Sequence, residues 1–283
     1  MSTPAAAQLE RWQRFRTNRN KALAARHGWL TLTSFQWLES QPSGVELAPG
    51  LWSTDGTTAT LTAAADDGLT LVETGETVDG TITASLADEE SLMWVQFGGE
   101  DGRQVVVELA MRAGRYAIRT RDSSSPVLTE FDGVPTFDYN PDLVVEAVYE
   151  PYPEPVAIPI GTANPLVDGV HYSVGEVVFR LPGIPHEYRL HAEEEKLGAL
   201  TIAFHDETNG SGPPDQATAE WRKVSTARPR VDPSGKATVI LDFNRAINYP
   251  SAFTPYGTCP MPVKNNSLDA RIEAGEKQPL LAA

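Results

Sequence analysis

Two polar blocks in the second half of the chain carry residue types that can build a ligand site. The first contains Asp206 and Thr208 and follows an apolar run. The second contains Asp242, Asn244 and Arg245 and follows a β-branched run. A carboxylate beside a carboxamide offers hydrogen-bond acceptors and donors on one surface, which suits the orientation of a polar ligand. We therefore expect a pocket for a small polar or anionic molecule at these blocks.

The loop from Tyr249 to Cys259 follows the second block and is rich in proline and aromatic residues. It is too long and too apolar for a disordered linker, so we expect it to pack on the fold, with Tyr256 and Cys259 as candidate ligand contacts. The polar blocks also have a purely structural interpretation. Aspartate and asparagine at a strand end commonly bond the backbone of a following loop, and Asp-x-Thr-x-Gly is an ordinary turn sequence. Ligand binding and loop fixation both stay open.

A hydrolytic site is a further interpretation. Ser251 or Cys259 as nucleophile, His205 as general base and Asp242 as its orienting group would supply the residue types. No Gly-x-Ser-x-Gly sequence surrounds Ser251, and no helix start near Cys259 would activate its thiol, so we expect a buried, inert cysteine. No spacing of Cys and His predicts a zinc site. The sequence identifies neither catalytic residues nor a cofactor.

Two basic features stand out in the first half of the chain. Arg119 and Arg121 fall on one face of a predicted strand, where we expect carboxylates such as Glu108 opposite them, with an anion-binding row as the alternative. A helix is predicted from residue 4 to about 26, because its apolar residues recur at helical spacing. We interpret its basic side chains as a solvated face over an acidic body. The alternative is contact with an anionic ligand or partner.

Short β-rich runs broken by turn dipeptides follow from residue 45 to about 121, which predicts antiparallel sheets arranged as a sandwich or barrel. Residues 122–142 are rich in turn formers and mark a boundary. Further strands follow, of which 156–160 is expected to be an edge strand or an extended connector because of its prolines. We predict a mainly β protein with an N-terminal α-helix. The expected parts are a helical segment at 1–40, a first β lobe at 41–130 and a second β lobe at 131–283.

The composition limits the partners. The chain of 283 residues carries a formal net charge of -15, which argues against non-specific binding to nucleic acids. No apolar segment approaches the ~20 residues that span a bilayer, and no signal peptide is evident, so we expect a cytoplasmic protein without a membrane partner. The single cysteine excludes an internal disulfide. The oligomeric state is not determined by the sequence.

The sequence LDFNRAxNxPxAFTPYxTCPxP at 241–262, followed by AGEK at 274–277, is similar to the signature of DUF1684, a bacterial and archaeal family of unknown function. The segment 202–210 resembles the second block of that family, and Gly28 to Leu32 with Trp37-Leu38 resembles its N-terminal block. The family usually reads Tyr-Asn-Pro-Pro-Cys where this chain has residues 247–251, so a function that needs a cysteine pair is not carried over. The resemblance implies kinship but no activity.

Three functions therefore remain open. The leading one is a small-molecule-binding β protein, with or without catalysis, whose pocket is formed by the polar blocks and the aromatic loop. The second is a structural or protein-interaction module, in which the C-terminal motif fixes the fold and the basic helix docks a partner. The third is the hydrolase.

Overall fold

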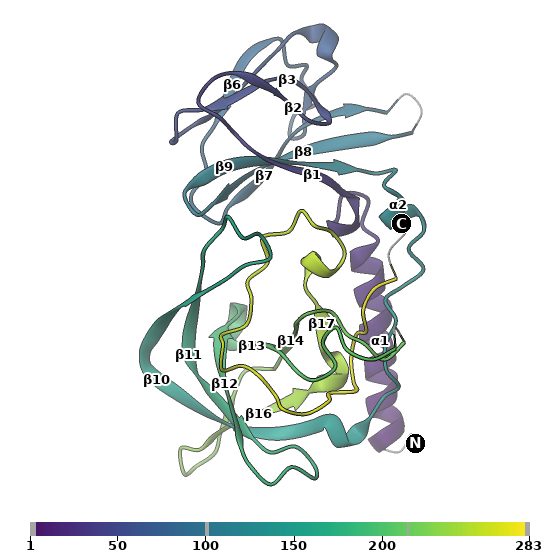
Figure 1. Cartoon of the computed structure of the whole chain (residues 1–283), viewed down its shortest axis with the longest axis vertical. Helices are drawn as coiled ribbons and strands as arrows, with labels where there is room; N and C mark the ends of the chain where they lie inside the picture. Colours follow the sequence, from purple (N-terminus) through teal and green to yellow (C-terminus); the bar gives the residue numbers. More distant parts are fainter. Residues whose placement is uncertain (1–3, 100–101, 214, 281–283) are drawn as a thin grey trace. The chain divides into compact units, whose positions relative to one another are not determined.

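The computed structural model describes residues 4–99, 102–213 and 215–280, and it is mainly β, with antiparallel sheets and an N-terminal helix (Figure 1). The predicted fold class is confirmed. The chain divides into two compact units, which we call the middle unit (21–132) and the terminal unit (4–20 with 133–280). No helix among the described residues is long and apolar enough to cross a membrane.

The middle unit contains a five-stranded sheet in the order β1-β9-β8-β7-β5 and a four-stranded sheet in the order β2-β3-β4-β6. The strands are β1 (Leu32–Trp37), β2 (Ser43–Val45), β3 (Ala48–Thr54), β4 (Ala59–Ala63), β5 (Thr70–Leu71), β6 (Gly80–Ala84), β7 (Ser91–Gly98), β8 (Gln104–Arg112) and β9 (Arg115–Asp122). Its short helices are η1 (Trp29–Thr31), η2 (Ala65–Asp67) and α2 (Pro126–Thr129). Both sheets contribute to one core, in which Trp52 and Trp94 meet edge to face at 5.8 Å between ring centroids.

The terminal unit contains one eight-stranded sheet in the order β15-β16-β10-β11-β12-β13-β14-β17. The strands are β10 (Val144–Ile160), β11 (Gly169–Phe179), β12 (Tyr188–Glu194), β13 (Leu200–Phe204), β14 (Arg222–Ser225), β15 (Arg230–Val231), β16 (Ala237–Asp242) and β17 (Ile247–Asn248). Its helices are α1 (Pro4–Leu23, of which residues 4–20 belong to this unit), η3 (Pro141–Leu143), η4 (Lys196–Gly198), η5 (Phe243–Arg245) and η6 (Pro250–Ala252). Buried side chains alternate with more exposed ones along β12, as the period-two pattern of a strand predicts. The buried residues of this strand are Tyr188, Leu190 and Ala192.

The core of the terminal unit places the C-terminal motif against the sheet. Phe243 is fully buried and lies 5.5 Å from Phe204 and 5.8 Å from Phe179, measured between ring centroids. The described part of the segment after β17 carries no long strand or helix, and it runs past α1 (Figure 1). The polar blocks follow β13 and β16, and the first block meets this segment, where the N–H of Glu207 donates to the carbonyl oxygen of Ala270 at 3.1 Å.

Several element boundaries differ from the sequence prediction. Helix α1 ends at Leu23 rather than near 26, and Leu32–Trp37, inside the segment expected to be helical, pairs as β1 with β9. Strand β16 ends at Asp242, because the next three residues turn as η5, so Asp242 and Asn244 do not share a strand face. Among the described residues, 156–160 pair with β11 and not with β16, so of the two predicted alternatives this stretch is an edge strand.

Candidate functional site

The first polar block lies in a buried network around Arg222, a β14 residue with no solvent exposure. Its guanidinium forms an ion pair with the carboxylate of Asp206, which also accepts the backbone N–H of Thr208 at 2.7 Å. The guanidinium donates to the carbonyl oxygen of Ala274 at 2.5 Å and to that of Ile272 at 3.0 Å. Burial lowers the pKa of Arg222, and the charge of Asp206 opposes this shift. The block thus fixes the C-terminal segment onto the sheet.

A second buried carboxylate, Glu276, joins helix α1 to the same segment. It accepts hydrogen bonds from Arg16 and Arg19, each at 3.0 Å, and from the backbone N–H of Asn248 at 2.7 Å. Our expectation of a solvated basic face was therefore wrong for these two arginines. Arg16 is only 9% exposed, and the ion pair with Glu276 compensates its buried charge. Arg14 remains on the surface, where it pairs with Glu10.

The second polar block is also engaged by the protein itself. The side chain of Asn244 exchanges two hydrogen bonds with the backbone of Asn140, at 2.7 and 2.8 Å, and also donates to Asp242. Burial raises the pKa of Asp242, while the bonds from Asn244 oppose the rise. The charge of Arg245 also opposes the rise, and its guanidinium lies 4.5 Å from the ring centroid of Phe15.

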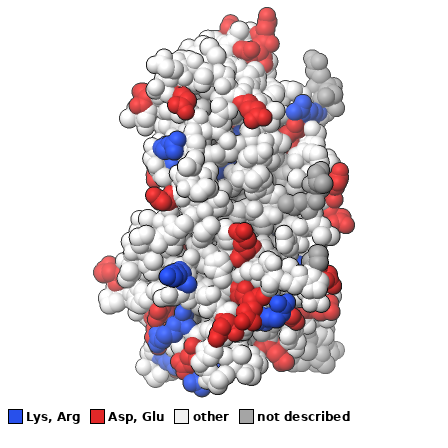
Figure 2. Space-filling view, viewed as in Figure 1, with Lys and Arg blue, Asp and Glu red and all other residues white. Residues whose placement is uncertain are grey.

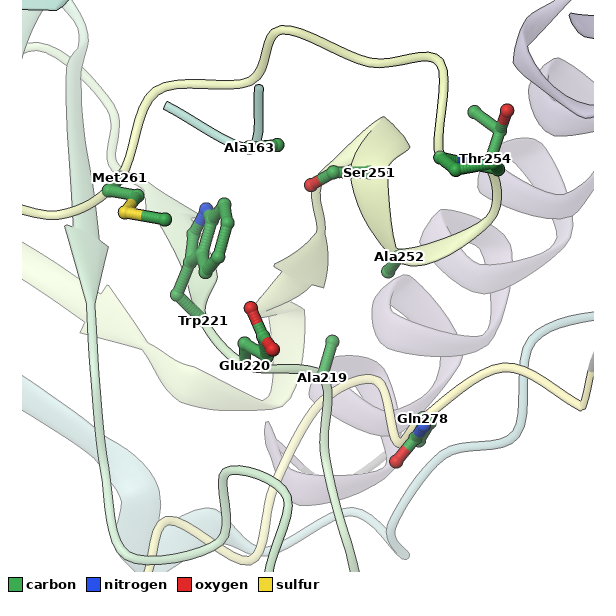
Figure 3. A pocket seen from close by; sticks show the side chains of 10 residues that line it. Ala163, Ala219, Glu220, Trp221, Ser251, Ala252, Thr254, Met261 and Gln278 are labelled. Atoms are coloured by element: carbon green, nitrogen blue, oxygen red, sulfur yellow. The ribbon is translucent and has the colours of Figure 1, made fainter. Parts of the chain in front are cut away.

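A cavity of about 300 Å³ lies beside the predicted loop (Figure 3). We call it the Trp221 cavity. Its lining residues come from five separate stretches of the chain: Ala163, Ala219, Glu220, Trp221, Ser251, Ala252, Thr254, Pro255, Met261 and Gln278. The loop thus adjoins a cavity, as expected. However, the candidate residues of the two polar blocks are not part of its wall, and neither Tyr256 nor Cys259 lines it.

Several wall side chains carry polar groups that pair with no described residue. Trp221 is 5% exposed, and its indole N–H has no hydrogen-bond partner among the described residues. The side chains of Glu220, Ser251 and Gln278 likewise form no hydrogen bond or ion pair with any described residue. The Ser251 hydroxyl points toward the Trp221 ring, and Glu220 extends from the chain directly before it (Figure 3). The wall therefore offers donors and acceptors beside an aromatic surface.

The residues proposed for hydrolysis do not form a hydrogen-bonded triad within the described chain. His205 bonds the backbone oxygen of Glu220 through Nδ1 at 2.9 Å, whereas Asp242 bonds Asn244. Ser251 lies in the cavity wall, and His205 does not. Cys259 is buried, as predicted. No group of three or more His, Cys, Asp or Glu residues in the described ranges is arranged to hold a metal ion.

The arginine row of the middle unit pairs as predicted with Glu108. The carboxylate of Glu108 lies 3.1 Å from Nη1 of Arg119 and 2.8 Å from Nε of Arg121, and strands β8 and β9 place these residues side by side. Burial raises the pKa of Glu108, but the two arginine charges outweigh burial and hold it below its usual value. Arg121 is further covered by the ring of Trp29, 5.0 Å away. This observation supports the structural interpretation of the row.

Sequence reasoning missed Glu220, Trp221, Met261 and Gln278 as wall residues. The sequence did contain a signal for Trp221. A tryptophan directly before a β-rich run is expected to be largely buried, and its indole N–H then needs a hydrogen-bond acceptor. No local signal connects Gln278 or Met261 with it.

Comparisons with known proteins give a family and a distant structural relative. The family model described as "Protein of unknown function (DUF1684)" matches residues 129–277. The chain is also similar to an uncharacterized protein of Haloarcula marismortui, solved in solution by NMR, with 28% sequence identity over 53% of this chain and 78% of that one, at a TM-score of 0.42. No curated protein matches the chain.

Proposed function

The chain belongs to the DUF1684 family, whose function is unknown, and we propose that it binds a small polar molecule in the Trp221 cavity. The observation that carries the proposal is the buried N–H of Trp221, a wall residue, which has no hydrogen-bond partner among the described residues. A buried donor without a partner costs about 1–3 kcal/mol, and a ligand oxygen that reaches it would recover part of this free energy. Native proteins seldom leave such a group unpaired without a reason.

The size and the lining of the cavity support the same proposal. A volume of about 300 Å³ is at the lower end of the range for small-molecule sites, which is roughly 300–1,000 Å³. Apolar groups such as Trp221 and Met261 stand beside a few polar ones, Ser251 and Gln278 among them, and this mixture is usual in ligand pockets. The described residues of the wall include no arginine or lysine, which favours a polar ligand over an anionic one.

In this proposal the buried network has a supporting role. Arg222 follows Trp221 directly, and its bonds to the carbonyl groups near the C-terminus hold β14 and the segment that leads to Gln278 in place. Rigid supports keep a binding wall in its productive geometry. The family motif thus fulfils two tasks, since one part locks the fold and another part, Ser251 to Pro255, lines the cavity.

The proposal is tested by filling the cavity. The Cβ of Ala163 points into it (Figure 3), so Ala163→Phe should occupy the space without touching the buried network. Ala157→Phe on the exposed part of β10 is the matched control. Thermal unfolding of wild type and both variants is measured against a panel of sugars, amines, polyols and nucleosides. A ligand at a hundred times its Kd adds about 2.7 kcal/mol of stability.

We expect at least one compound to stabilise wild type and Ala157→Phe but not Ala163→Phe. A panel without such a compound, or compounds that stabilise all three proteins equally, would refute binding in this cavity.

A further inference from the structure

The wall of the Trp221 cavity carries a single ionisable side chain among the described residues, that of Glu220. This carboxylate is exposed and has no ion pair or hydrogen bond within the described chain. It is therefore available to a bound molecule, in contrast to Asp206 and Glu276, whose carboxylates are occupied by arginines. An unpaired negative charge at a binding wall attracts cations and repels anions.

Three basic side chains close to Trp221 and Glu220 do not line the cavity. Arg222 is occupied by Asp206 and by the carbonyl group of Ala274, and His205 bonds the backbone oxygen of Glu220 through Nδ1 at 2.9 Å. Lys223, two residues after Trp221, lies over the ring of Tyr249 at 5.4 Å and within 4.0 Å of Glu195. It does not line the cavity. The protein as a whole carries a net charge of -15, and acidic side chains are spread over the face shown in Figure 2. The summed field of an acidic protein raises the local concentration of cations.

The remaining wall groups define the other end of the ligand. The indole N–H of Trp221 can only donate, so it requires an acceptor such as a hydroxyl or carbonyl oxygen. The hydroxyl of Ser251 and the amide of Gln278 both donate and accept, so they set no further condition. The indole ring adds an aromatic surface, which favours ammonium groups through its quadrupole.

We propose that the Trp221 cavity is selective for small organic cations, that is, ammonium compounds that also carry a hydroxyl or carbonyl oxygen. The ammonium group pairs with Glu220, and the oxygen accepts the N–H of Trp221. This inference rests on the proposed function, because it names the ligand class of the same cavity.

The test compares matched compounds that differ in charge. The first set is choline, its neutral isostere 3,3-dimethyl-1-butanol and the anionic 3,3-dimethylbutanoate, and the second set is glucosamine, glucose and glucuronate. Binding to the full chain is measured by isothermal titration calorimetry, with wild type, Glu220→Gln and Glu154→Gln. Glu154 is an exposed residue of β10 outside the wall, so its variant has the same change of charge without a change at the cavity.

We expect the cation of at least one set to bind wild type about fivefold or more tightly than its neutral partner, which is the upper range of an exposed ion pair. Glu220→Gln should remove this difference, and Glu154→Gln should keep it. If neutral or anionic members bind as well as the cations and Ala163→Phe abolishes their binding, the charge preference is wrong while the cavity remains a binding site. If no member of either set binds, the cation preference is rejected, and the broader panel with Ala163→Phe then decides separately on the cavity itself.

Discussion

Replacement of Arg222 by methionine should destabilise the terminal unit more than any surface substitution. The variant leaves the carboxylate of Asp206 buried without its partner, and two backbone carbonyl groups, those of Ile272 and Ala274, lose their donor. Breaking a buried ion pair by removing one partner costs about 3–5 kcal/mol. Each unpaired buried carbonyl costs about 1–3 kcal/mol, although these contributions are not additive. We expect a loss of at least about 4 kcal/mol.

The control is Arg245→Met, which removes the same functional group from an exposed position. The guanidinium of Arg245 makes a cation–π contact with Phe15, worth about 0.5–1 kcal/mol at an exposed site. Because the chain contains two compact units, unfolding in urea is followed by hydrogen exchange in peptides from β13 and β14, which report on the terminal unit alone.

A loss of about 4 kcal/mol is a large share of the 5–15 kcal/mol that stabilises a typical protein, so Arg222→Met could fail to fold. The double variant Asp206→Asn with Arg222→Met keeps the experiment informative. Neutralising Asp206 removes the buried, uncompensated charge, so the double variant should be more stable than Arg222→Met alone. If Arg222→Met lost no more stability than Arg245→Met, the ion pair would not be a determinant of the fold and our reasoning would be refuted.

Two predictions concern pH. Glu108→Gln should cost the middle unit about 3–5 kcal/mol at pH 7, because Arg119 and Arg121 lose their partner. The folded-state pKa of Glu108 is lowered, so Glu108 contributes its full stabilisation above the unfolded-state pKa of about 4.3 and loses it as the pH falls through the folded-state pKa. The free energy of unfolding is measured by urea titration at several pH values. A difference between wild type and Glu108→Gln that stays constant down to about pH 2 would contradict this prediction. The folded-state pKa of Asp242 is raised by burial. Asp242 therefore contributes to the free energy of unfolding below its unfolded-state pKa of about 3.9 and loses this contribution as the pH rises through its folded-state pKa. Asp242→Asn should therefore be more stable than wild type at pH 7, with an advantage that shrinks toward pH 4, provided that the new amide oxygen still accepts from Asn244; equal stabilities at pH 7 would count against this assignment.

The sequence alone determined the fold class and one of the charge pairings. The alternation of apolar and polar residues in β12, and the turn dipeptides between strands, follow from the backbone geometry of strands and turns, which acts over a few residues. The pairing of Arg119 and Arg121 with Glu108 was predictable for the same reason, because adjacent antiparallel strands joined by a short turn bring them side by side. Patterns of this kind are visible before any tertiary contact is known.

The tertiary structure decided which polar residues lock the fold and which face a cavity. Arg16 and Glu276 are 260 residues apart, and although its spacing from Trp12 puts Arg16 on the apolar face of the helix, no local pattern identifies Glu276 as its partner. The Trp221 cavity likewise joins stretches from Ala163 to Gln278 that have no common sequence pattern. Whether a side chain is buried, paired or left free depends on which distant segments pack against it. This information arises only when the chain closes its long loops and forms a core, so a local pattern does not contain it.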